Sequence, residues 1–174
     1  MNRKTLMLVL AIAAWAPMLG SALMAQEGEP SYSPEGAWFA WARIVGRPNP
    51  FPFLDTYTSD ANNQGRSGTV LCTLATRKFT GPTGTPVSVT PSAQGNWVRI
   101  DKNQFAFTAW RILLDEEGRG VCAAKFWGTL TIQTNDTFTG TMNAAYYYGE
   151  STTPFSTFTG TTTGTRIAIE APED

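Results

Sequence analysis

Histidine is absent from the 174-residue chain, which excludes several common kinds of active site. Neither a Ser-His-Asp nor a Cys-His catalytic arrangement can form without an imidazole, and the commonest zinc ligand is missing. Acidic residues are available for calcium, but they are scattered and lack the loop spacing of an EF-hand: Asp55, Asp60, Asp101, Asp115 and Asp136. We therefore expect no metal site and no cofactor.

Charged residues are also few, at 16% of the chain, and they give a formal net charge of −1. The basic residues are isolated, as Arg43 and Arg47 are, and they form no cluster of the kind that binds phosphates. This composition argues against nucleic acid or an anionic membrane surface as a partner.

A long apolar run occurs only near the N-terminus, where it has the plan of a signal peptide. Arg3 and Lys4 precede the apolar segment, and small residues allow cleavage after Ala22 or Ala25. The segment is short for a membrane span, and an uncleaved anchor is the alternative. We predict a signal peptide over 1–25 and a secreted or periplasmic mature protein without an integral membrane span. Its charge would be −3, with 11 basic and 14 acidic residues.

Cysteine occurs twice, as Cys72 and Cys122. An even number of cysteines in an exported chain is typical of a disulfide, and a pair of buried free thiols is the equal alternative. The two residues fall on predicted strands that are not neighbours. A bridge would therefore require their side chains to meet across a narrow end of the fold.

The rest of the chain is rich in Thr, Gly and aromatic residues, and one phrase occurs twice, at Phe138–Thr141 and Phe158–Thr161. Thr and Phe favour strands, and turn-forming residues separate the runs. After a polar leader over 26–35, which we expect to be flexible, the pattern predicts an all-β, eight-stranded antiparallel up-and-down barrel over 36–169. A tail over 170–174 follows. The predicted strands are 36–45, 53–58, 68–76, 95–100, 104–114, 120–133, 137–148 and 155–169, with one long loop over 77–94. An outer-membrane barrel is a competing interpretation, but two of these strands are short for it.

Two residues, one in the first predicted strand and one in the last, form a recognisable pair. Gly36-Ala37-Trp38 opens the first strand, and Arg166 lies in the last. This order resembles the calycin pattern, in which a G-x-W Trp closes one end of a barrel and an Arg packs over it. The resemblance implies structural roles for Trp38 and Arg166. The chain lacks the helix that usually follows the last lipocalin strand, and it is equally similar to allene oxide cyclase-like and dirigent-like barrels.

An eight-stranded barrel can hold one small ligand or fill its interior with side chains. Alternation gives each strand two faces, but it does not say which face points inward. The strand over 104–114 is apolar on both faces, which is compatible with an outer face covered by another subunit in a homo-oligomer. The candidate ligand-binding residues are the large aromatic and basic side chains of three strands: Phe105, Phe107, Trp110, Arg111, Lys125, Trp127, Tyr146 and Tyr148.

Three functions remain open from the sequence. The first is an exported, non-enzymatic barrel that binds a small apolar, aromatic or amphipathic molecule. The second is a cofactor-free cyclase or isomerase that folds a substrate inside the same interior, where Arg111 or Lys125 would bind a carboxylate or enolate oxygen and Tyr146 would donate to an oxyanion. The third is a structural or protein-binding barrel with a filled core.

Overall fold

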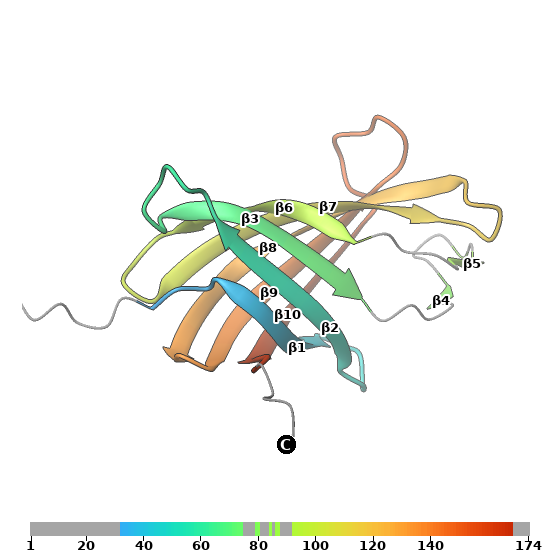
Figure 1. Cartoon of the computed structure of the whole chain (residues 1–174). Helices are drawn as coiled ribbons and strands as arrows, with labels where there is room; N and C mark the ends of the chain where they lie inside the picture. Colours follow the sequence, from blue (N-terminus) through green and yellow to red (C-terminus); the bar gives the residue numbers. More distant parts are fainter. Residues whose placement is uncertain (1–31, 75–78, 81–83, 85, 88–91, 169–174) are drawn as a thin grey trace, which may run out of the picture. The chain divides into compact units, whose positions relative to one another are not determined.

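The computed structural model describes residues 32–74, 79–80, 84, 86–87 and 92–168 of the chain. The predicted signal peptide, most of the predicted leader and the predicted tail lie outside these residues. Eight strands close into a barrel in which each strand pairs with both neighbours in antiparallel fashion (Figure 1). No helix occurs among the described residues, so the predicted all-β up-and-down barrel is confirmed.

The strands follow one another around the barrel in chain order, with one small insertion. The barrel strands are β1 (Gly36–Ile44), β2 (Phe51–Ser59), β3 (Ser67–Leu74), β6 (Ala93–Arg99), β7 (Gln104–Leu114), β8 (Gly120–Thr134), β9 (Thr137–Tyr147) and β10 (Ser156–Arg166). The insertion is a two-stranded sheet of β4 (Phe79–Thr80) and β5 (Pro86–Val87) between β3 and β6. It occupies part of the segment 77–94, which the sequence predicted to be one long loop.

Several strand boundaries differ from the predicted ones by two or three residues: β2 is longer than the predicted strand 53–58, β6 begins before the predicted 95, and β10 ends before the predicted 169. Pro52 had argued for a turn, but it lies near the beginning of β2, opposite Trp41 of β1. A proline is tolerated near the beginning of a strand, where fewer ladder hydrogen bonds are needed. The strand therefore begins at Phe51.

Burial alternates along the strands and identifies the inner face that the sequence left open. On β1, the side chains of Trp38, Ala40 and Ala42 are fully buried, whereas Phe39 and Trp41 between them are 43% and 42% exposed. Inner residues of seven strands form the apolar core, and β10 adds the buried Thr162; the outer face keeps several large apolar side chains in contact with solvent. Alternation of this kind is what a closed barrel with a side-chain-lined interior requires.

The repeated phrases lie on the neighbouring strands β9 and β10 and meet at their last residues, where Thr141 is opposite Thr161. Their phenylalanines point inward, and their outer positions carry threonine. Packing requires a glycine at position 164, because a Cβ atom there would lie 2.1 Å from the ring of Phe138. The small residue lets an aromatic ring pack directly against the neighbouring strand.

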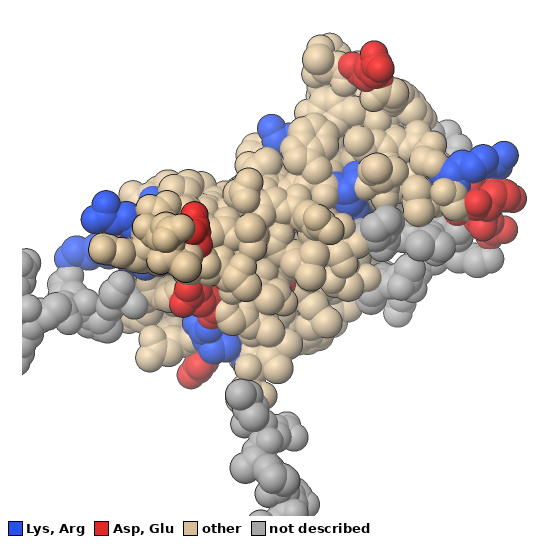
Figure 2. All heavy atoms as spheres, turned by 45° about the horizontal axis from the view of Figure 1, so that its top comes forward, with Lys and Arg blue, Asp and Glu red and all other residues tan. Residues whose placement is uncertain are grey.

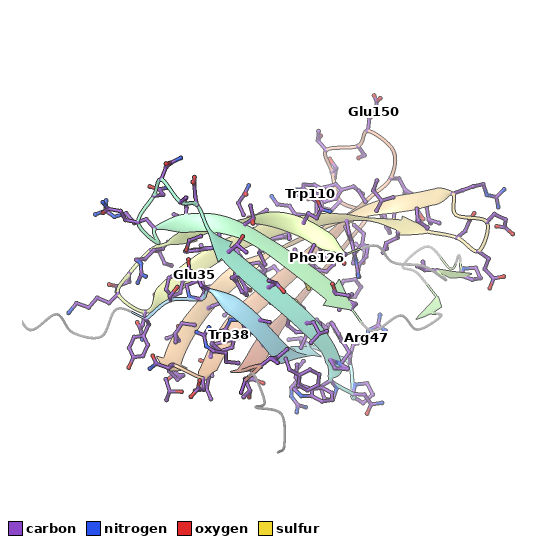
Figure 3. The ribbon with its side chains drawn as sticks, in the orientation of Figure 1. Glu35, Trp38, Arg47, Trp110, Phe126 and Glu150 are labelled. Atoms are coloured by element: carbon purple, nitrogen blue, oxygen red, sulfur yellow. The ribbon has the colours of Figure 1, made fainter. Side chains whose placement is uncertain are left out.

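One end of the barrel is closed by the two residues that carried the calycin resemblance. The Arg166 guanidinium lies 4.2 Å from the centre of the Trp38 ring, and Trp38 Nε1 donates a 2.7 Å hydrogen bond to the carbonyl of Pro34. Arg166 also donates to the carbonyls of Ser33 and Glu35. Figure 3 shows Glu35 and Trp38 together at this end. Residues 33–35, predicted as part of a flexible leader, are therefore held against the barrel, because they supply carbonyl acceptors for the side chains of Trp38 and Arg166.

Charged side chains are scattered over the face drawn in Figure 2 rather than gathered in one patch. Arg119, for example, pairs with Asp115 and Glu117 in the turn between β7 and β8. In the described part of the chain, no helix is long and apolar enough to cross a membrane.

Candidate functional site

A cavity lies inside the barrel, bounded by residues of seven strands. It measures about 550 Å³ when all space between atoms is counted, including its opening to solvent. Its walls are largely apolar: Phe51, Phe53, Val70, Leu74, Ala93, Phe107, Ala109, Phe126, Leu130 and Met142.

Asp55 is the buried carboxylate of this cavity. It lies on the inner face of β2, where Oδ2 accepts a 2.9 Å hydrogen bond from the Tyr57 hydroxyl. Cys72 lies directly opposite Asp55 on β3. Burial raises the pKa of Asp55 to about 6, although the nearby Cys72 thiol and the Tyr57 hydroxyl oppose that rise. Burial and the nearby Asp55 charge also raise the pKa values of Tyr57 and Cys72.

Arg111 is the buried cation of the same cavity, on the inner face of β7. Its guanidinium carbon lies 4.9 Å from the centre of the Phe126 ring, and Tyr146 on β9 lies close enough to influence its pKa. Burial lowers the pKa of Arg111, and the nearby Tyr146 and Cys72 partly oppose this. An aromatic face and a phenol partly compensate a buried guanidinium, but neither carries the full negative charge of a carboxylate.

Three polar atoms that border the cavity have no hydrogen-bond partner among the described residues: Asp55 Oδ1, Arg111 Nε and Thr162 Oγ1. These residues are only 6%, 7% and 3% exposed. A buried polar atom without a partner costs about 1–3 kcal/mol, so native proteins rarely keep several of them together. A molecule that enters the hollow could therefore form hydrogen bonds at two positions, an acidic one at Asp55 and a basic one at Arg111.

Cys72 and Cys122 are both free thiols in the structure. Both contribute to the electrostatic environment of Arg111. Burial raises the pKa of each thiol. The two side chains therefore remain neutral at neutral pH and act as small members of the inner wall.

Three of the predicted ligand residues lie on the outer face of the barrel and cannot line the cavity. Trp110 is 45% exposed, and Figure 3 shows it on the side of the sheet away from the interior. The Lys125 ammonium lies 5.7 Å from the Trp110 ring centre and 5.4 Å from that of Trp127. Strand β7 is apolar on both faces, which is why alternation alone could not separate Trp110 from its inward neighbours.

Of the other five predicted residues, four lie on the inner face and Tyr148 lies beyond the end of β9. Phe107 and Arg111 line the cavity itself. Phe105 is fully buried toward the closed end, where its ring packs 5.7 Å from Trp97. Tyr146 lies near Arg111 and raises its pKa. Tyr148 follows the end of β9, stacks on Phe155 at 4.1 Å and is 43% exposed.

Sequence reasoning missed the acidic end of the site. Asp55 and Tyr57 could be read as solvated outer residues that interrupt a strand. The signal that could have placed them is their alternation with Phe53, because F-x-D-x-Y puts all three side chains on one face. Thr162 carries no comparable signal, because it is one of many threonines on β10.

Comparison with known proteins adds little beyond the course of the chain. No protein-family model matches it, and a search of curated proteins gives no significant match. Among solved structures, it is similar to a chain described as "Structure of EF1p2_mFAP2b bound to DFHBI". The TM-score is 0.47 at 12% identity, covering 76% of this chain and 93% of that chain.

Proposed function

We propose that the protein binds one small, largely apolar molecule that carries polar oxygen or nitrogen groups. The observation that carries this proposal is the apolar hollow with three unpartnered buried polar atoms, from Asp55, Arg111 and Thr162. Apolar walls with a few convergent polar groups are the usual composition of small-molecule sites. The signal peptide predicted at 1–25 would place this binding outside the cytoplasm.

A test of the proposal is to isolate the mature protein from its own organism and analyse the small molecules that remain bound. Native mass spectrometry should show one bound molecule per chain. Ala109→Leu should abolish this species, because the added atoms enter the hollow. Ala106→Leu on the opposite face of the same strand is the matched control and should retain it. An empty wild-type protein, or a molecule retained equally by Ala109→Leu, would refute binding at this site.

A second candidate function is a cofactor-free isomerase or cyclase, and the pKa of Asp55 favours it. A carboxyl group with a pKa of about 6 exchanges a proton readily near neutral pH, which suits a general acid or base. Arg111 could stabilise an enolate oxygen formed in the same hollow. Asp55→Asn separates the two functions once the molecule is known. A binding protein should retain affinity for a neutral ligand, whereas a catalyst should lose turnover by about 100-fold or more.

A further inference from the structure

The cavity contains one cation and one weak acid that do not neutralise each other. Asp55 and Arg111 both border the hollow, but no ion pair joins them in the described residues. Asp55 directs one oxygen to Tyr57 and keeps the other unpartnered, while Arg111 faces an aromatic ring and a phenol. A buried guanidinium without an anion is costly, and an anion that enters the cavity would relieve this cost.

The other groups around Asp55 and Arg111 do not supply that anion. Tyr57 on the same strand and Cys72 on β3 face Asp55, and Tyr146 and Cys122 face Arg111. All four have raised pKa values and are neutral near pH 7. Apart from Cys122 on β8 and Tyr146 on β9, the residues that β1, β6, β8, β9 and β10 contribute to this region have no titratable side chain: Trp38, Ala93, Phe126, Leu130, Met142 and Thr162.

Resting on the proposed function, we propose that the ligand is an organic anion whose charged oxygens bind Arg111, and that Asp55 takes up one proton from solvent as the anion binds. The reason is the shared low-dielectric hollow. An anion at Arg111 leaves the Asp55 carboxylate as a second negative charge nearby, and like charges in one site favour protonation of the weaker acid. The protonated carboxyl can then donate a hydrogen bond toward the ligand, which an ionised carboxylate cannot do.

The coupling has a defined pH dependence. The free protein holds Asp55 with a pKa of about 6, so above that value the carboxylate must gain a proton before or during binding. Between this pKa and the higher pKa of the complex, affinity for the anion falls as pH rises, by up to about tenfold for each pH unit. Below about pH 6 the free protein is already protonated at Asp55, and the dependence disappears.

The experiment uses 2-naphthoate and its neutral isostere 2-naphthamide as probes of the mature protein, measured by isothermal titration calorimetry. Wild-type affinity for 2-naphthoate should fall at least about fivefold between about pH 6.5 and pH 8, whereas affinity for 2-naphthamide should stay constant. Titrations in buffers of different ionisation enthalpy should show uptake of up to about one proton with naphthoate only. Asp55→Asn should remove both the pH dependence and the proton uptake, and Asp136→Asn, an exposed acid, should change neither.

A matched pair of basic variants tests the anion site. Arg111→Met should weaken 2-naphthoate binding by about 10-fold or more and change 2-naphthamide binding much less. Lys125→Met removes one cation from the outer face of the neighbouring strand and should leave both affinities unchanged. Circular dichroism and thermal unfolding would establish that each variant is folded, and Arg111→Lys gives a second test if the Met variant does not fold.

The possible failures are distinguishable. If neither probe binds, the proposed function and this inference are both wrong. If both probes bind equally tightly and without pH dependence, the cavity binds small molecules but has no preference for anions. If naphthoate binding depends on Arg111 but not on pH, or the dependence persists in Asp55→Asn, the proton uptake by Asp55 is refuted.

Discussion

Replacing Asp55 by Asn should stabilise the folded protein at neutral pH, because the ionised carboxylate is buried at a cost. Its pKa rises from 3.8 to about 6 on folding, so the folded state binds the proton more tightly than the unfolded state. The sign follows from this linkage. The carboxyl imposes no penalty below about pH 3.8, and the penalty grows as pH rises until it is complete above about pH 6.

The magnitude follows from the size of the shift. About two pKa units correspond to about 3 kcal/mol at pH 7.5, and to about 1 kcal/mol at pH 4.5, where the unfolded carboxyl is only partly ionised. The Asn side chain can still accept the hydrogen bond from Tyr57 through its carbonyl oxygen, so the variant leaves the hydroxyl satisfied. The gain in stability of Asp55→Asn over wild type should therefore be about 2 kcal/mol larger at pH 7.5 than at pH 4.5.

Urea unfolding of the ligand-free protein, followed by tryptophan fluorescence at both pH values, measures this difference. All other titrating groups are common to the two proteins and cancel in the comparison. Asp136→Asn, in an exposed turn, should show almost no pH-dependent difference from wild type. A stability difference for Asp55→Asn that is equal at both pH values, or larger at pH 4.5, would show that the carboxyl is not buried as described.

Further predictions concern the closed end, the strand crossings and the thiols. Trp38→Ala should lower the free energy of unfolding by about 3–5 kcal/mol, and Arg166→Met should lower it less, both measured by urea unfolding; an unchanged midpoint for Trp38→Ala would contradict its role as the end plug. Gly95→Ala should lower the melting temperature strongly, since its Cβ would lie 1.8 Å from a backbone oxygen of β7, and a variant as stable as wild type would contradict that packing. Without reductant, Cys72 and Cys122 should both react with a thiol reagent after denaturation and much more slowly before it; a count of zero thiols would indicate a disulfide.

The fold could be predicted from the sequence because its signals are local. Turn residues separate the strands, Thr and aromatic residues alternate along them, and the Trp38–Arg166 pair marks where the barrel begins and ends. The structure extends this signal to residues 33–35, whose carbonyls accept hydrogen bonds from the pair. That extension could not be read from a polar, proline-containing segment, because the acceptors are backbone atoms that every residue carries.

The site was less predictable because it depends on which face of each strand points inward. Trp110 and Arg111 are adjacent in sequence and lie on opposite sides of the barrel wall. Strand β7 has apolar side chains at both sets of alternating positions, so hydrophobicity gives no direction. Asp55 illustrates the reverse difficulty, because a lone acid in a strand is usually solvated, and only the surrounding barrel makes it buried.

The pairing of β1 with β10 has a consequence for how the chain reaches its folded state. Trp38 is paired with Arg166 and Ile44 with Gly160, so β1 gains this neighbouring strand only when β10, the last strand of the chain, is in place. Until β10 docks, the edges of β1 and β9 expose unpaired backbone groups to other chains. Contacts this distant in sequence slow folding, since the loop must close before they contribute. Variants that weaken the closing seam should therefore aggregate during refolding at protein concentrations that the wild type tolerates.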